Sequence, residues 1–261
     1  MLKKVMRSGI LLAAVNVLLF SCETFTGALA SISTSLSNLS ASDAGTAGSS
    51  DPGRRADPDA AHWDIDALDT ARDAEYLTGL EKDVVLEMNK ARSSPKKYAE
   101  LYIQPRLRYY SGNNYSEPGQ ITIVTREGKK AVEDCAAALS RMQSSPLLTP
   151  ELGLSRGAKD HTADQGKTGQ TGHNGSDRST PFTRIERYGG GYNRAGENLA
   201  YGSRTGRDIV VDLLVDDGVP SRGHRANIMD RRFTQTGVSC GTHPQFRTMC
   251  AITYANGYVN K

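Results

Sequence analysis

The sequence predicts an α+β domain in which helices come first and paired strands come last, preceded by a polar N-terminal segment. Apolar residues recur every three or four positions between 76 and 91 and again between 129 and 142, which is the period of an amphipathic helix. They alternate with period two between 236 and 254, as in a hairpin with one buried face. The 261 residues suit one ordinary domain with a tail.

The chain begins with a segment typical of an export signal. A basic start, MLKKVMR, precedes an apolar run from Ile10 to Phe20 that is interrupted by Asn16. The 11 residues of this run are too few to cross a hydrocarbon core of about 30 Å as a helix. We therefore interpret residues 1–21 as a signal peptide.

The signal ends in Leu19-Phe20-Ser21-Cys22, which resembles a bacterial lipobox. We expect Cys22 to be lipidated and its acyl chains to anchor the protein in a membrane, because several chains bind durably where one does not. The alternative is ordinary cleavage nearby, which leaves Cys22 without a role. Glu23 in place of an inner-membrane-type Asp favours the outer membrane or surface of a bacterial cell envelope.

The charge balance gives no support to nucleic-acid binding. The formal net charge is +3, and three of the positive charges, Lys3, Lys4 and Arg7, lie in the signal peptide. The processed chain is therefore close to neutral and has no concentrated basic stripe in its sequence. We expect no nucleic-acid partner.

A flexible tether is predicted over residues 22–74, which are rich in Ser, Thr, Ala, Gly and Asp. Such a composition buries too little apolar surface to offset the entropy of ordering. The sole tryptophan, Trp63, falls near its end. We place the folded domain at residues 75–261.

Within the domain, capping signals place two later helices. Thr149 and Pro150 favour a helix start, and the same helix carries His161 on its apolar face, where a hydrogen-bonded core histidine is the commoner role. The Gly-rich stretch after Gly172 is interpreted as loop until Asp208, which we take as the next N-cap. Residues 109–125 favour a hairpin-like excursion.

Cysteine positions predict one buried thiol and one disulfide. Cys135 lies on the apolar face of a predicted helix and is interpreted as a small buried hydrophobe. If Cys240 pairs with Cys250, Val238 lies opposite Ile252, so one register keeps both cysteines on the buried face. In an exported protein a cross-strand disulfide is then favoured over two thiols.

The polar residues best suited to metal binding or acid–base chemistry lie between Gly172 and Asn227. They are two histidines and three carboxylates, each beside glycines that allow tight turns: His173, Glu197, Asp216, Asp217 and His224. Together they would form a carboxylate-lined pair of imidazoles suited to zinc or another divalent ion. Four arginines of the same region would rim the cleft or form a solvated face: Arg178, Arg184, Arg187 and Arg194.

Six motifs in order resemble the CAP superfamily, the cysteine-rich secretory protein, antigen 5 and pathogenesis-related domain, in its bacterial branch. They are VVLEMNKAR, LSRGAKDHTAD, GHNGS, GENLAYG, GHRANIM and TQTGVSCG. The resemblance implies a three-layer α-β-α sandwich with a small antiparallel sheet. It also implies a cleft lined by His173, Glu197 and His224, whose histidines hold a divalent ion. Asp216 stands where the family's eukaryotic members have a Glu, which is one methylene longer, so we expect Asp216 to act through water.

Three function classes remain open. The first is an envelope binding module with a small-molecule, lipid or protein ligand in the cleft. The second is a metal-dependent hydrolase, in which the metal would activate a water molecule held between the histidines and Glu197. The chain has no GxSxG, HExxH or catalytic-cysteine signature. Ser221, close to His224, is interpreted as a helix cap rather than a nucleophile. The third is a lipid or sterol carrier.

Overall fold

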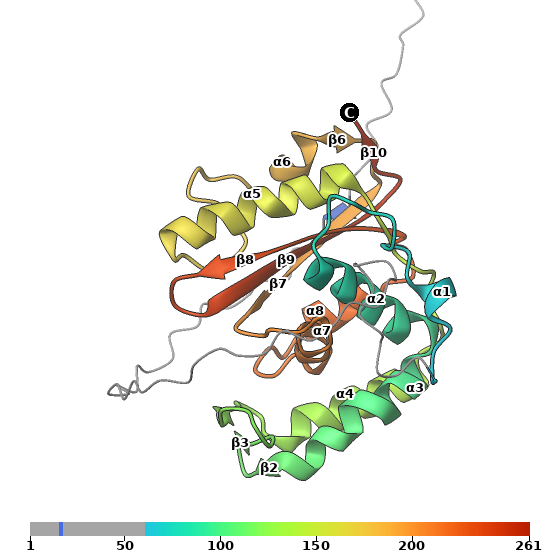
Figure 1. Ribbon diagram of the computed structural model, residues 1–261, viewed down its shortest axis with the longest axis vertical. Coiled ribbons are helices and arrows are strands. Elements are labelled where there is room, and N and C mark those ends of the chain that lie inside the picture. The colour runs from blue at the N-terminus through green and yellow to red at the C-terminus, as the bar shows by residue number, and fades with distance from the viewer. Residues whose placement is uncertain (1–15, 18–60) are drawn as a thin grey trace, which may run out of the picture.

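The computed structural model describes residues 16–17 and 61–261, which form three layers (Figure 1). Helix α5 (Leu152–Thr168) covers one face of the central sheet, and α2 (Gly79–Ser93), α7 (Gly206–Val215) and α8 (Gly223–Met229) cover the other. Helix α4 (Lys129–Arg141) lies outside α2 and α7. The predicted α-β-α sandwich is therefore confirmed. Cys22, most of the signal peptide and residues 23–60 lie outside the described residues.

Three antiparallel strands form the centre of the sheet in the order β7 (Arg194–Tyr201), β9 (Arg247–Asn256) and β8 (Gln235–His243). Two-residue strands extend it in parallel at both edges, β1 (Asn16–Val17) beside β7 and β5 (Thr149–Pro150) beside β8. Cys240 lies opposite Cys250 and is joined to it by a disulfide, so the predicted register and linkage are confirmed.

The remaining elements are short. They are α1 (Ile65–Leu68), α3 (Pro95–Tyr98), the π-helical turn η1 (Ala99–Ile103), the 3-10 helix η2 (Gln104–Tyr109), α6 (Pro181–Glu186), and the strands β2 (Tyr110–Ser111), β3 (Asn114–Tyr115), β4 (Ile123–Val124), β6 (Gly189–Gly190) and β10 (Val259–Asn260). Strands β2, β3 and β4 form a small antiparallel sheet, which is the predicted excursion. None of the helices within residues 61–261 is both long and apolar enough to cross a membrane.

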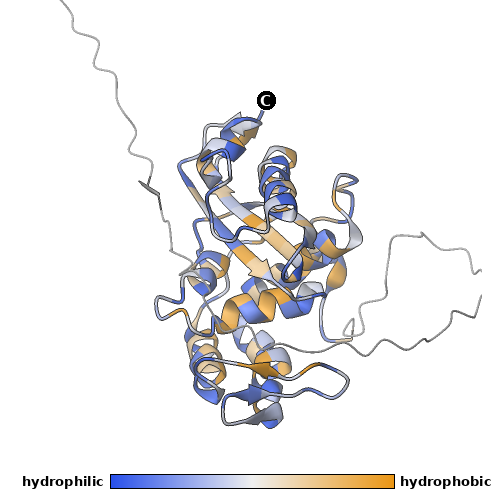
Figure 2. Ribbon diagram, turned by 90° about the vertical axis from the view of Figure 1, so that its left-hand side faces the viewer, coloured by the Kyte–Doolittle hydropathy of each residue, from blue (hydrophilic) through white to orange (hydrophobic). Residues whose placement is uncertain are grey.

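The main hydrophobic core lies between the sheet and the helices beneath it. Figure 2 shows apolar residues concentrated on the central strands and on the helices that pack against them. Trp63, Ile65 and Leu68 are also part of this core, and the Trp63 indole donates a hydrogen bond to Tyr102 Oη at 2.8 Å. The packed domain therefore begins well before residue 75, because three apolar side chains near the end of the predicted tether have a core to enter.

Two predicted helix starts were wrong. Thr149 donates its N–H to the Thr234 carbonyl and joins the sheet, so α5 begins at Leu152 without a side-chain cap. Thr205, not Asp208, is the N-cap of α7, and its hydroxyl accepts the Asp208 N–H. At Thr149 a sheet partner far along the chain replaced the local signal, and at Asp208 a hydroxyl three residues upstream did so.

Cys135 is completely buried on α4, as predicted, and remains a free thiol. Burial raises the pKa of its thiol to about 12. A neutral, inaccessible thiol is a packing group and not a nucleophile.

The packing of α5 on β8 depends on Gly237, because a Cβ there would overlap the backbone of Leu154 and Ser155. We predict that Gly237→Ala lowers the free energy of unfolding by about 2–3 kcal/mol, as overpacking against rigid backbone does. Urea unfolding measures the change. Gly79→Ala in α2 is the matched control, since its Cβ would meet nothing within 4 Å. Equal stability of the two variants would contradict the close approach of α5 to β8.

Candidate functional site

The candidate site is arranged around strand β7, which the sequence analysis took for a loop. All residues of the strand except Tyr201 are buried. Consecutive residues of a strand point to opposite faces of the sheet. Glu197 therefore reaches the side of α5 and α6, and Asn198 reaches the side of α8.

On the first face, Glu197 bonds to two cationic or polar partners. Its Oε1 accepts from His173 Nδ1 at 2.8 Å, and its Oε2 accepts from Arg184 Nη2 at 2.7 Å. Burial by itself would raise the pKa of Glu197, but the hydrogen bond from His173 and the charge of Arg184 hold it below the usual range. Glu197 is therefore an ionised carboxylate with both oxygens engaged.

Arg184 also fixes the loop that carries His173. Its Nη1 donates to the His173 carbonyl at 3.0 Å and to the Ser179 carbonyl at 3.1 Å. The guanidinium is buried on α6, whose start is capped by Thr180. One side chain thus orients both the carboxylate and the backbone of the histidine that the carboxylate binds.

On the second face, Asp216 holds His224 directly. Asp216 ends α7 in the left-handed conformation, with φ of 58°, and its Oδ1 accepts from His224 Nδ1 at 2.6 Å. Its Oδ2 accepts the His224 backbone N–H at 2.9 Å, at the start of α8. The shorter acid therefore acts on the imidazole itself and not through water, and it takes the capping role that we assigned to Ser221.

Polar bonds attach both histidines to adjacent positions of β7. Asn198 Nδ2 donates to the His224 carbonyl at 3.0 Å. Asn227 Nδ2 donates to the Asn198 side chain at 2.9 Å and to the Glu197 carbonyl at 3.4 Å. The loop after α5 and the start of α8, which are 51 positions apart at their histidines, are thereby fixed to one stretch of strand.

Both imidazoles share one hydrogen-bonding pattern. In each, Nδ1 donates to a carboxylate, and Nε2 is buried without a partner among the described residues. Because an ionised carboxylate only accepts hydrogen bonds, Nδ1 carries the proton, and in the neutral imidazole Nε2 then has the lone pair. A carboxylate behind a histidine is the arrangement that orients metal-binding imidazoles. Each imidazole is therefore oriented as a metal ligand would be, although within the described part of the chain no group of three or more His, Cys, Asp or Glu residues could hold an ion.

Two predicted or weighed residues lie outside this arrangement. Asp217 accepts the backbone N–H groups of Arg126 and Glu127 at 2.7 and 2.8 Å, so it fastens the loop before α4. His161 is buried, with its Nε2 bonded to the Gly172 carbonyl at 2.9 Å, and burial lowers its pKa. It is the hydrogen-bonded core histidine that the helix pattern favoured.

Two of the four arginines have neither of the roles weighed for them, a cleft rim or the favoured solvated face. Arg184 is buried against Glu197, and Arg194 is buried against Asp230. Arg187 is an exposed residue paired with Asp160 and Asp177. Sequence reasoning missed Arg184 as part of the site because a run of arginines resembles a solvated face. The capping pattern Thr180-Pro181, which starts a helix in this stretch, was the available signal.

The chain is thus an α+β domain of three α-β-α layers, with one carboxylate-bound histidine on each face of strand β7. A family model described as the Cysteine-rich secretory protein family (CAP) matches residues 87–255, and the chain belongs to this family.

Among similar proteins is the uncharacterized protein YkwD of Bacillus subtilis strain 168, 32% identical over 110 residues, which are 42% of this chain and 40% of that protein. The match thus spans less than half of either protein. An outer surface protein of Borrelia burgdorferi is 20% identical, with a TM-score of 0.36 over 42% of this chain and 77% of that one. An extracellular SCP-domain protein of Bacillus anthracis strain Ames is 24% identical, with a TM-score of 0.36 over 43% and 34% of the two chains.

The depressed pKa of Glu197 predicts a stability that depends on pH. The unfolded chain holds this carboxyl at a pKa of about 4.3, and the folded chain holds it lower, so the folded state is favoured most above pH 4.3. The advantage is lost as pH falls through the folded pKa. We predict that the stability difference between wild type and Glu197→Gln narrows as pH falls below about 4. Urea unfolding between pH 3 and 7 measures it; a constant difference would contradict the ion pair.

Proposed function

We propose that the protein is a binding module of the cell envelope whose two-histidine site holds one divalent ion, with zinc foremost. The observation that carries the proposal is the pair of buried Nε2 atoms of His173 and His224, each on an imidazole held from behind by a carboxylate. An unpartnered buried lone pair is costly unless a ligand or ordered water meets it. A metal ion is a ligand that both nitrogens can accept in the same protonation state.

His173 and His224 would supply two of the ion's ligands, and Glu197 and Asp216 would orient them. A zinc ion bound by two imidazoles keeps open positions, where it acts as a Lewis acid toward an oxygen or nitrogen of a ligand. Two protein ligands make a weaker site than the three that are usual for catalytic zinc. This number favours reversible binding of a metal and a guest over catalysis.

The contacts of Glu197 favour the binding role over the hydrolase alternative. A general base needs an ionised group within reach of the proton that it abstracts. Both oxygens of Glu197 already accept hydrogen bonds, one from His173 and one from Arg184. His224 Nε2, the nitrogen that a serine nucleophile would face, has no hydrogen bond to Ser221 or to any other group within the described residues, so a serine and its base are not assembled there.

Zinc titration tests the metal site. We predict that calorimetry detects one zinc ion per wild-type chain and that a His173→Ala, His224→Ala double variant loses this binding, because the two free lone pairs are removed. His62→Ala is the matched control, since His62 is exposed and belongs to neither face of β7. Retention of the same zinc binding by the double variant would refute the assignment. After a chelator has removed the zinc, a second titration should show the same zinc binding again.

We propose in addition that Cys22 is the lipidated N-terminus of the processed protein, which anchors the domain at the outer membrane or surface of a bacterial envelope. The support is the lipobox-like sequence at residues 19–22. We predict that Cys22→Ala and globomycin each block processing and move the protein from the detergent phase to the aqueous phase of a Triton X-114 split. Unchanged processing and partitioning under both treatments would exclude lipidation.

A further inference from the structure

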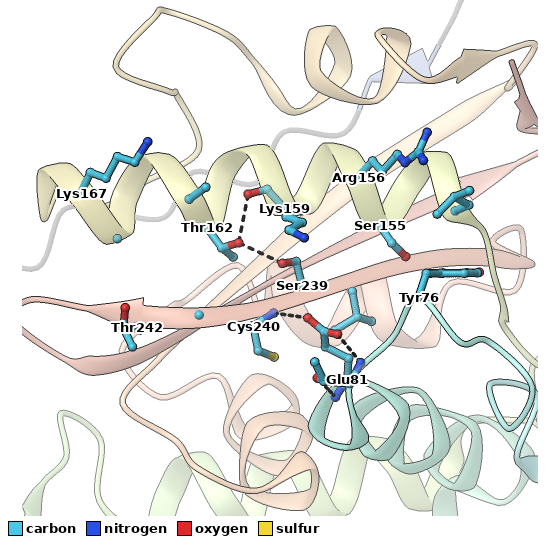
Figure 3. A pocket seen from close by; sticks show the side chains of 16 residues that line it. Tyr76, Glu81, Ser155, Arg156, Lys159, Thr162, Lys167, Ser239, Cys240 and Thr242 are labelled. Carbon is cyan, nitrogen blue, oxygen red and sulfur yellow. Dashed lines mark hydrogen bonds between the residues drawn. The ribbon is translucent and has the colours of Figure 1, made fainter. Parts of the chain in front are cut away.

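A groove of about 730 Å³ lies at the sheet edge farthest from the histidines, between α5, strand β8 and the start of α2 (Figure 3). Strand β9 separates β8 from β7, so the groove and the histidine site are different places. Its volume is in the range of small-molecule sites. The wall along α5 is polar and charged, as the labelled side chains of Figure 3 show.

Three cations line the α5 wall, and none of them forms an ion pair with a carboxylate of the described residues. Arg156, Lys159 and Lys167 are exposed and recur at helical spacing on one side of α5. Neither lysine ammonium has an ion pair or hydrogen bond within residues 61–261, and Arg156 only stacks on the Tyr188 ring at 5.9 Å. Lys159 and Lys167 are eight residues apart, which is about 12 Å along a helix. The wall is therefore complementary to a ligand with separated negative charges.

The acid that lines the groove is already engaged. Glu81 is buried, and its Oε1 accepts the Cys240 N–H at 2.8 Å while its Oε2 accepts the Thr78 N–H at 2.7 Å. Figure 3 shows these bonds between β8 and the start of α2, whereas the Lys159 side chain comes from α5 on the other side of β8 and those of Arg156 and Lys167 extend away from the strand. Glu81 thus contributes structure and leaves the positive charge of the opposite wall for a guest.

One end of the groove also offers a hydroxyl and an aromatic ring. Ser155 is 7% exposed, its Oγ has no hydrogen-bond partner within the described residues, and it lines the groove on the side facing β8. A buried hydroxyl without a partner loses free energy that a ligand can restore. Tyr76 stands nearby with 42% of its surface exposed, as a flat apolar platform with a polar tip.

The same residues argue against two other guests. An acyl chain would bury little area, because Leu152 and Val238 are the large aliphatic side chains of the lining. An added peptide strand would need the outer edge of β8, which has no strand partner past Thr236 in the described chain. The Glu81 carboxylate on the Cys240 N–H occupies the position of an added strand's carbonyl, which protects the edge.

We propose that this groove binds an anionic oligosaccharide. Its acidic groups contact Arg156, Lys159 and Lys167, one sugar ring packs on Tyr76, and a ring hydroxyl bonds to Ser155. A sugar chain supplies the separated charges, the flat apolar ring faces and the hydroxyl groups together. The site needs no metal and does not depend on the histidines.

Calorimetry at low ionic strength with trigalacturonate, a three-ring sugar acid, tests the proposal, with neutral maltotriose as the comparison. We expect trigalacturonate to bind and the Lys159→Glu, Lys167→Glu variant to bind at least ten-fold more weakly, with the difference shrinking as salt is added. The matched control is Lys129→Glu, Lys130→Glu, an equal charge change on exposed residues of α4. It should stay within two-fold of wild type, and Ser155→Ala should weaken binding several-fold.

Retained binding by the His173→Ala, His224→Ala variant separates this groove from the histidine site. The proposal is overturned if trigalacturonate does not bind, if maltotriose binds equally well, or if the α4 control loses as much affinity as the α5 variant. Tetraglutamate serves as the peptide comparison. Equal binding of tetraglutamate would show an acidic-peptide site and would also overturn the assignment to a sugar.

Discussion

The buried ion pair between Arg184 and Glu197 is the interaction on which the rest of the site depends. Strand β7 carries a carboxylate into the interior, where an unpaired charge would cost several kcal/mol. Arg184 compensates that charge at 2.7 Å and also holds the carbonyl of His173. The ion pair that neutralises Glu197 therefore also fixes helix α6, the loop that carries His173 and the His173 ring.

A second carboxylate, that of Asp216, orients a histidine on the other face of the sheet. Asp216 ends one helix and begins the next, and it turns the ring of His224 through the same type of bond that Glu197 makes to His173. Both rings keep a proton on Nδ1 and a lone pair on Nε2. Burial makes an unpartnered lone pair costly, so a ligand that binds it recovers this free energy. The site is polar where the surrounding core is apolar, as functional sites commonly are.

Periodicity predicted the helices over residues 76–91 and 129–142 and the register of the disulfide, because these depend on neighbours within a few residues or on one strand pair. The family resemblance supplied the α-β-α arrangement. The sequence did not reveal β7, since RAGENLAY contains two charged residues and looks like a loop until Arg184 and Asp230 are placed beside them. Partners more than ten residues away decide such cases, and the same applies to Asp217, whose backbone partners lie on the loop before α4.

Two surfaces at opposite sheet edges thus carry different chemistry, one with paired lone pairs and one with unneutralised cations. The account rests first on the histidines. Long-range ¹H–¹⁵N NMR of the metal-free protein near pH 9 reports directly which ring nitrogen of each neutral imidazole carries the proton. The account predicts Nδ1–H and a bare Nε2 for both His173 and His224. A proton on Nε2 of either ring would contradict it.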